Sequence, residues 1–259
     1  MTMDSIASRL SLSIVLLLGA AAAHAGAAAR CPEVDVGIPS NADPTSVASA
    51  AAALKDAPLI AYAIRDDHGY SLKQALASGM SPDVCVLDGG LVAYAAALGA
   101  VDDLRILIDH GVDPDGLRDP DGGTALLRAI STRHFDSVAL LLDRGADPRV
   151  TTDSGNTALL TATSLVFDPG SAGTACQLAL AKRLLAAGAA VDARLTRRGT
   201  TSLMQSALRG DADMVRLLLD HGADAAARNA KGISVLDFAR KSGNAEVVAM
   251  VGAALAGKR

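Results

Sequence analysis

The chain has 259 residues, of which half are apolar and only 2% are aromatic. Because Ala, Leu and Val supply most of the apolar content, small-faced helices are favoured and an aromatic-cored β-sandwich is excluded. The net charge of −4 and the scarcity of rings also argue against nucleic-acid binding, which needs clustered cations or stacking aromatic side chains.

The first 25 residues have the pattern of an export signal. An apolar run follows Arg9 and ends at the small-x-small motif Ala23-His24-Ala25, which is typical of a signal-peptidase site. We therefore predict a signal peptide over residues 1–25, cleaved near Ala25, and a periplasmic or secreted mature protein that does not enter the membrane. An uncleaved N-terminal membrane anchor is the alternative, because Asp4 offsets the charge of Arg9.

Two segments and three cysteines lie around the start of the folded part. Residues 26–43 are expected to be extended, and the Ala-rich residues 44–57 to form an N-terminal capping helix. Export implies an oxidising compartment, in which a disulfide between Cys31 and Cys85 would tie the extended segment to the first folded units and leave Cys176 over. Three reduced cysteines are the alternative, since spacing in sequence does not fix the distance between Cα atoms.

A glycine recurs along the chain about every 33 residues, each time after an apolar pair. The residues three, four and seven positions before it are apolar in every case, which is one face of a helix. The glycine stands just past the helix end, where a left-handed backbone penalises any Cβ. One wider spacing, from Gly145 to Gly188, predicts an insertion of about 10 residues. The recurring glycines are Gly79, Gly111, Gly145, Gly188 and Gly222.

A hydroxyl residue recurs upstream, where each unit's first helix is expected to begin. Thr124, Thr157 and Thr201 each precede a short apolar run and are suited to N-cap a helix. Polar turns such as Ala146-Asp147-Pro148 follow the glycines and cannot continue the helix. Each unit is therefore predicted to consist of a turn, a short helix, a returning helix and a loop.

These motifs resemble the ankyrin-repeat family, whose unit begins G-x-T-P-L-H and ends L-L-x-x-G-A-D. The closing motif is nearly complete at residues 141–147 and 218–224. The resemblance implies an all-α solenoid of helix-turn-helix units with short β-hairpin-like finger loops. The Pro and His of the opening motif are replaced, so its Thr-to-His hydrogen bonding must be absent or replaced; the replacing pairs are Ala125 and Leu127, Ala158 and Leu160, and Ser202 and Met204. We expect six units, at residues 58–83, 84–115, 116–149, 150–192, 193–226 and 227–255.

The resemblance implies a protein-binding function, because the finger loops and inner helices of this family line a concave face that binds other proteins. We expect a monomeric, non-catalytic interaction module of the cell envelope, acting as an immunity or protective factor or as a helper of an exported enzyme. The candidate partner-binding residues lie in the finger loops and on the inner helices; they are Asp119, Pro120, Asp121, Gly123, Ser131, Thr132, Thr152, Asp153, Asn156, Arg197, Arg198, Thr200 and Arg209.

The finger loops are expected to change the sign of their charge along the chain. The loops around residues 113–121 and 147–153 carry net charges of −3 and −1, whereas those around 192–198 and 224–231 carry +2 and +1. Such a gradient would orient a partner of opposite polarity. Chance charge on solvated loops is the alternative.

The sequence contains no recognisable catalytic, metal-binding or phosphate-binding motif, so no enzyme activity, cofactor or metal is expected. The Asp-His pairs at 109–110 and 220–221 lie in stacked units, where a His at a helix C-terminus favours the helix dipole, and His134 is expected to be structural. A competing hypothesis places an enzymatic or redox site in the insertion, at Asp168 and Cys176, with residues 171–174 flexible. A structural envelope scaffold is the third.

Overall fold

The computed structural model describes residues 29–30, 64, 72–86, 89–167 and 171–257. The predicted signal peptide, the predicted capping helix and half of the first unit lie outside these ranges, as do Cys31 and Asp168, so the expectations for them stay predictions. Within the described ranges, no helix has the length and apolar character needed to cross a bilayer.

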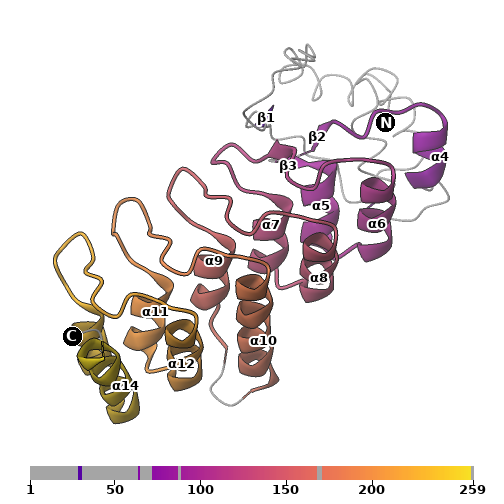
Figure 1. The fold of residues 1–259 in the computed structure, drawn as a ribbon. Coiled ribbons are helices and arrows are strands. Elements are labelled where there is room, and N and C mark those ends of the chain that lie inside the picture. The colour runs from indigo at the N-terminus through magenta and orange to yellow at the C-terminus, as the bar shows by residue number, and fades with distance from the viewer. Residues whose placement is uncertain (1–28, 31–63, 65–71, 87–88, 168–170, 258–259) are drawn as a thin grey trace, which may run out of the picture.

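Helix pairs stack in a single curved row (Figure 1). Each inner helix packs on the inner helix of the next unit, and a second row of outer helices covers one side of them. The inner helices are α5 (Leu91–Leu98), α7 (Ala125–Ser131), α9 (Ala158–Ser164), α11 (Ser202–Arg209) and α13 (Val235–Ser242). The outer helices are α4 (Leu72–Ala77), α6 (Val101–Asp109), α8 (Phe135–Asp143), α10 (Ala172–Ala186), α12 (Ala212–Asp220) and α14 (Ala245–Ala256).

Local sequence signals fix where these helices begin and end. The Thr124, Thr157 and Thr201 hydroxyls each accept a hydrogen bond from the backbone N–H three residues on, at 3.3–3.4 Å, as an N-cap does. Ser234 and Asp237 form a reciprocal capping box at α13. The five repeat glycines all have φ between 84° and 97°, so the predicted left-handed helix ends are confirmed.

The core is a continuous strip of small and branched side chains between the two helix rows. At the predicted apolar positions four and seven residues before each glycine, the side chains are almost completely buried; Leu107 and Leu141, for example, are both 0% exposed. The position three residues before the glycine lies at the edge of the strip, where Ile108 and Leu142 are only partly buried. Each unit therefore buries its apolar face both between its own two helices and against its neighbours.

The finger loops connect successive units along one edge of the array (Figure 1). We number them three (residues 112–123), four (146–156), five (189–200) and six (223–233). Backbone hydrogen bonds join neighbouring loops: the N–H groups of Asp153, Thr196 and Ala230 donate to carbonyl groups of the preceding loop at 2.8–3.0 Å. The fingers thus form one continuous ladder rather than separate projections.

Short strands occur at the N-terminal end of this ladder. Strand β2 (Cys85–Val86) pairs antiparallel with β3 (Gly89–Gly90). Strand β1 (Ala29–Arg30) lies within the segment predicted to be extended and pairs in parallel with β4 (Leu117–Arg118) of finger loop three. Residues just after the predicted leader therefore contact the finger edge directly.

The insertion in the fourth unit lengthens a helix. Helix α10 has 15 residues, whereas α8 and α12 have nine each. The expected flexible stretch at 171–174 is helical from Ala172 on, so that prediction is wrong. The buried Gln177 amide donates to the carbonyl groups of Ala162 and Leu165 at 2.8 and 3.0 Å, which fastens the extra helical turns to the end of α9.

Candidate partner-binding surface

Most of the predicted partner-binding residues are accessible at the finger edge and at the C-terminal ends of the inner helices. The loop residues lie at the finger edge, and Ser131, Thr132 and Arg209 lie at or just past the ends of the inner helices that are farther from it. The exposed ones are Asp121, Ser131, Thr132, Asp153, Arg197, Arg198 and Arg209, and the partly exposed ones are Pro120, Thr152, Asn156 and Thr200.

The structure corrects the prediction for Asp119 and Gly123, which are both buried. Asp119 is 7% exposed; its carboxylate accepts a hydrogen bond from the Gly123 N–H, and its Oδ2 lies 3.3 Å from Arg128 Nε. A Cβ on Gly123 would collide with this carboxylate. Burial and the neighbouring Asp121 carboxyl raise the pKa of Asp119, against the opposing effect of the Gly123 N–H and Arg128. Asp119 therefore stabilises its loop from inside and is not presented to a partner.

A second carboxylate of finger loop three binds the next finger. Asp115 Oδ2 accepts a hydrogen bond from the Asp147 N–H at 2.7 Å. Burial raises the pKa of Asp115, and the nearby charges of Asp113 and Asp147 add to the increase. Its other oxygen, Oδ1, is buried and has no hydrogen-bond partner among the residues that the structure describes.

The same contact recurs between finger loops five and six, where Asp192 Oδ1 accepts from the Asp224 N–H at 3.0 Å. Asp115 and Asp192 both stand four residues after a repeat glycine, which is a signal that sequence reasoning missed.

Finger loop four pairs its arginine with one of its two aspartates. Arg149 contacts Asp147 through two nitrogens, with Nε 3.0 Å from Oδ1 and Nη2 3.1 Å from Oδ2. This bidentate geometry is the favourable one for an Arg–carboxylate pair, and it lowers the pKa of Asp147. The loop therefore presents less free charge than its sequence indicates.

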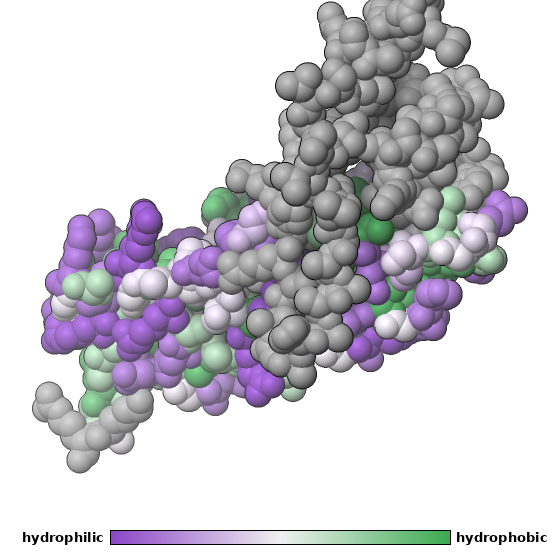
Figure 2. Space-filling model, turned by 90° about the horizontal axis from the view of Figure 1, so that it is seen from above, coloured by the Kyte–Doolittle hydropathy of each residue, from purple (hydrophilic) through white to green (hydrophobic). Residues whose placement is uncertain are grey.

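Finger loops five and six expose cations. Arg194 and Arg228 donate to backbone carbonyl groups, those of Arg228 and Gly232, at 2.8 and 2.7 Å. Arg197, Arg198 and Lys231 are exposed, and no ion pair joins them to a carboxylate in the part of the chain that the structure describes. Figure 2 shows strongly hydrophilic residues gathered at the left, the end of the array that carries these two loops.

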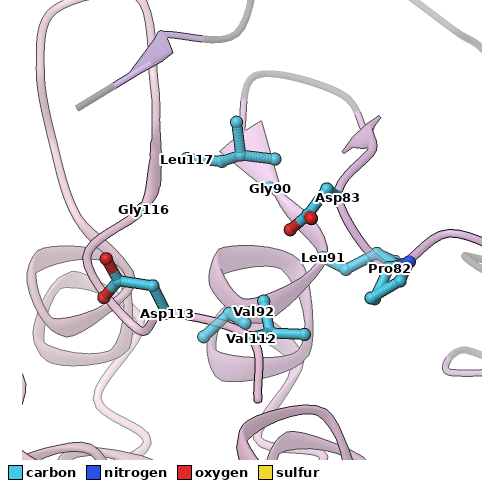
Figure 3. Close-up of a pocket in the computed structure, with 9 residues that line it drawn as sticks. All are labelled: Pro82, Asp83, Gly90, Leu91, Val92, Val112, Asp113, Gly116 and Leu117. Carbon is cyan, nitrogen blue, oxygen red and sulfur yellow. The ribbon is translucent and has the colours of Figure 1, made fainter. Parts of the chain in front are cut away.

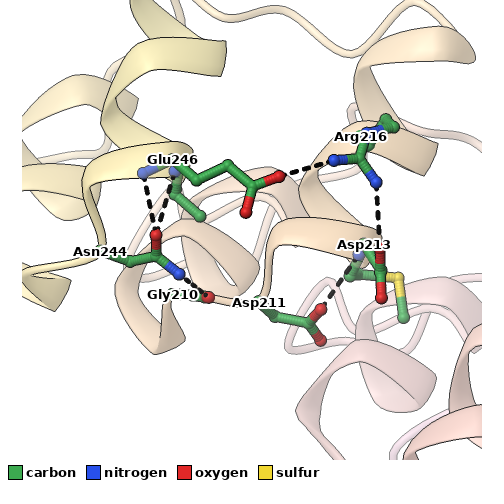
Figure 4. Close-up of polar contacts among 8 residues, drawn as sticks. Gly210, Asp211, Asp213, Arg216, Asn244 and Glu246 are labelled. Carbon is green, nitrogen blue, oxygen red and sulfur yellow. Dashed lines mark hydrogen bonds and ion pairs between the residues drawn. The ribbon is translucent and has the colours of Figure 1, made fainter.

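The outer helices use their charges differently, because they pair them between units. Arg216 of α12 contacts Asp213 of its own helix and Glu246 of α14 at 3.0 and 2.7 Å (Figure 4). Nearby, the Asn244 side chain donates to the Gly210 carbonyl at 2.8 Å. The same pattern of ion pairs joins the earlier units, through Arg144 with Asp109 and Arg183 with Asp143.

The C-terminal ends of the inner helices carry polar side chains that are partly committed to their own fold. Arg209 donates to the Thr163 carbonyl, and Ser164 contacts the Gln205 amide oxygen at 2.9 Å. The Ser131 and Thr132 hydroxyls donate to carbonyl groups of their own helix. These residues are accessible to a partner but are less free than the cations of finger loops five and six.

The insertion adds an exposed apolar residue beside these helix ends. The Arg133 guanidinium lies 4.8 Å from the centre of the Phe167 ring, a cation–π distance, and its Nη2 donates to the Val166 carbonyl at 3.3 Å. The Val166 side chain itself points outward and is 71% exposed. The loop before α10 is therefore held by unit three, and it offers a partner one apolar contact.

Within the described residues, neither Cys85 and Cys176 nor a small pocket forms a recognisable reactive site. Cys176 is exposed and free on α10, and Cys85 is disulfide-bonded; the predicted pairing with Cys31 lies outside the described residues. A pocket of about 140 Å³ opens between β3 and finger loop three (Figure 3). Its described lining is largely apolar, with Asp83 and Asp113 at the rim. We assign no chemistry to it.

Stacked helix pairs joined by a ladder of finger loops define a helical repeat protein. Comparison with known families identifies which one. Residues 50–152 match a family profile described as ankyrin repeats (3 copies), and residues 184–239 match one described as ankyrin repeats (many copies). The chain belongs to the ankyrin-repeat family.

Three curated relatives match parts of the chain. A putative ankyrin repeat-containing protein of Treponema pallidum (strain Nichols) is 34% identical over 102 residues, which is 38% of this chain and 34% of that protein. The ankyrin repeat and SOCS box protein 16 of Homo sapiens is 37% identical over 148 residues, 57% of this chain and 30% of that protein. The E3 ubiquitin-protein ligase KEG of Arabidopsis thaliana is 25% identical over 219 residues, 71% of this chain and 13% of that protein. The chain thus spans about a third or less of the length of each.

Proposed function

We propose that this chain is a non-catalytic module of the cell envelope that binds a protein partner through its finger loops and the concave face of its inner helices. Ankyrin repeats are in general protein–protein interaction modules, and the family is shown by the matches above. The choice of this surface rests on one contrast among the described residues: charges are paired on the outer helices and unpaired cations are exposed on the finger loops. Ion pairs link the outer helices from unit to unit, while the cations of finger loops five and six are exposed.

The proposed envelope location rests on the predicted signal peptide over residues 1–25, which the sequence alone supports. In that compartment, a monomeric binding module would act by covering or assisting another protein. An immunity or protective factor, or a helper of an exported enzyme, is the role that fits such a module. The alternative hypothesis of a redox or enzymatic site in the insertion would use Cys176, which is exposed and free; turnover that is lost in Cys176→Ala would favour it.

The test is to express the chain with its leader, fractionate the cells and determine the N-terminus of the mature protein by mass spectrometry. A photo-crosslinking residue replaces Ala230 of finger loop six in one variant and Ala179 of α10 in a matched control; both alanines are exposed. We expect an envelope location, a start at Gly26, and a partner crosslinked from position 230 only.

Two results would contradict this proposal. An unprocessed chain in the cytoplasm would remove the envelope location and the roles that depend on it. A partner crosslinked equally from positions 230 and 179 would mean that binding does not favour the finger edge.

A further inference from the structure

We propose that finger loops five and six form a docking site for an acidic segment of the protein partner. This inference rests on the proposed function and specifies the chemistry of what binds there. The site consists of exposed cationic side chains on two adjacent loops; they are Arg194, Arg197, Arg198, Arg228 and Lys231.

These cations keep most of their hydrogen-bonding capacity. A guanidinium group has five N–H donors, and Arg194 and Arg228 each use one nitrogen on a backbone carbonyl. Those two bonds also hold the stems of both side chains along the loops. Arg197 and Arg198 make no hydrogen bond or ion pair through their side chains within the described residues. An incoming carboxylate would therefore find preorganised donors of the kind that bind carboxylates in a bidentate way.

The carboxylates of the same two loops are turned to the backbone. Asp192 accepts from the Asp224 N–H at 3.0 Å, and Asp224 accepts from the Ala226 N–H at 3.1 Å. Both Asp residues are partly buried, whereas the five cations are exposed. The local acidic groups thus serve the loop structure, and the charge presented to solvent is positive.

The spacing of the loops suits an extended polypeptide. The Ala230 N–H donates to the Arg198 carbonyl at 3.0 Å, so the two loops are neighbours in one ladder. Backbone segments joined by such a hydrogen bond lie about 4.8 Å apart. An extended segment rises about 3.3 Å per residue, so carboxylates about two residues apart would reach both loops.

A protein segment fits this surface better than a long polyanion such as nucleic acid. The same finger edge continues to loop three, where Asp113 and Asp121 are exposed, and the chain as a whole has a net charge of −4. A nucleic acid running along the edge would be repelled there, and the chain has few aromatic side chains for stacking. A short acidic segment uses only the basic end of the edge.

The test measures binding of a fluorescein-labelled 12-residue peptide of alternating Glu and Ser to the full chain by fluorescence anisotropy, at about 0.05 M and about 0.5 M salt. A peptide of alternating Gln and Ser is the uncharged probe. The site variant is R197E/R198E. The matched control, R105E/K182E, makes the same change of net charge at exposed positions on the outer helices α6 and α10.

We expect the wild type and the control to bind the Glu peptide alike, the site variant to bind it at least about tenfold more weakly, and high salt to abolish the difference. Equal loss in both variants, or equal binding of the Gln peptide, would overturn the inference. Tighter binding of a 12-residue oligothymidylate or of phosphatidylglycerol vesicles, with the same dependence on Arg197 and Arg198, would overturn it in favour of another polyanion.

The crosslinking experiment separates the two proposals. If the Ala230 crosslink to the partner persists in R197E/R198E and the wild type does not bind the Glu peptide, the inference fails and the proposed function stands. If the wild type yields no partner from position 230, the proposed function itself fails, whatever the peptide does.

Discussion

Finger loops three and five carry opposite charge and use it in opposite ways. In loop three, Asp119 is buried against the Gly123 N–H and Arg128, so a charge counted in sequence belongs to the loop's own structure. In loop five, Arg197 and Arg198 are exposed and make no such contact within the described residues. The sign of a loop's charge can therefore be read from its sequence, whereas the share available to a partner depends on which charged side chains are used in the loop's own hydrogen bonds and ion pairs.

The largest effect on stability is expected from removing the buried carboxylate of loop three. Asp119→Ala leaves the buried Gly123 N–H without an acceptor and Arg128 without its partner. We expect a loss of about 1–3 kcal/mol in the free energy of unfolding, as for other buried groups left unsatisfied. Denaturant titration followed by circular dichroism measures it.

Two further variants control this measurement. Asp119→Asn keeps an oxygen that can accept from Gly123 and should lose less. Asp121→Ala, at an exposed position of the same loop, removes a like charge beside Asp119 and should not lower the stability. An Asp119→Ala protein as stable as the wild type would mean that Asp119 has no structural role.

The variant Asp115→Asn tests how a buried carboxyl group in loop three makes the stability of the protein depend on pH. The pKa of Asp115 is raised above its ordinary value of 3.8, first because the group is buried. A carboxyl whose pKa is higher in the folded state binds protons preferentially there, so its contribution to stability falls as the pH rises through that range. Asp115→Asn removes the charge and keeps an acceptor for the Asp147 N–H. We therefore expect the variant to gain stability over the wild type at neutral pH, with the gain disappearing as the pH falls toward 4.

The matched control is Asp192→Asn in loop five, which keeps an acceptor for the equivalent Asp224 N–H. Its neighbours in the loop are Arg194, Arg197 and Arg198, so neutralising it removes a carboxylate from a cationic loop and should bring no gain at neutral pH. Unfolding curves at several pH values compare the two variants. Equal gains from both substitutions would show that the charge around the carboxylate does not matter.

The sequence was sufficient for the repeat architecture because its signals are local. A glycine with positive φ ends the returning helices α4, α6, α8, α10 and α12 at the predicted positions, and Thr124, Thr157 and Thr201 cap inner helices as expected. Helix ends depend on a few neighbouring residues, so one unit contains the information that it needs. The insertion was harder, because Gly and Ser residues indicated a loop while the Ala-rich continuation favours helix, and the buried Gln177 contacts settled it for the helix.

The candidate surface depends partly on contacts between residues of different units, which the sequence of a single unit does not reveal. The Asp115 contact with the Asp147 N–H joins residues 32 positions apart, and it exists only because one finger stacks on the next in a particular register. The burial of Asp119 arises within one unit, from the contacts of its turn with Gly123 and with Arg128 of the following helix, and a count of charges does not show it. A count of charges along the chain could therefore predict the basic end of the finger edge, but it overstated the acidic charge that is free for a partner.

The smallest effect on stability is expected from reversing the exposed cations of loop five. R197E/R198E reverses two charges in loop five but removes no hydrogen bond or ion pair of the described structure. We expect the free energy of unfolding to change by less than about 0.5 kcal/mol, as for surface substitutions away from structural features, against the larger loss from Asp119→Ala. Denaturant titration of the two variants under the same conditions measures both. A loss in R197E/R198E as large as that in Asp119→Ala would mean that the cations of loop five also hold their own loop together, and a weaker binding of acidic peptide by that variant could then be ascribed to a misfolded finger.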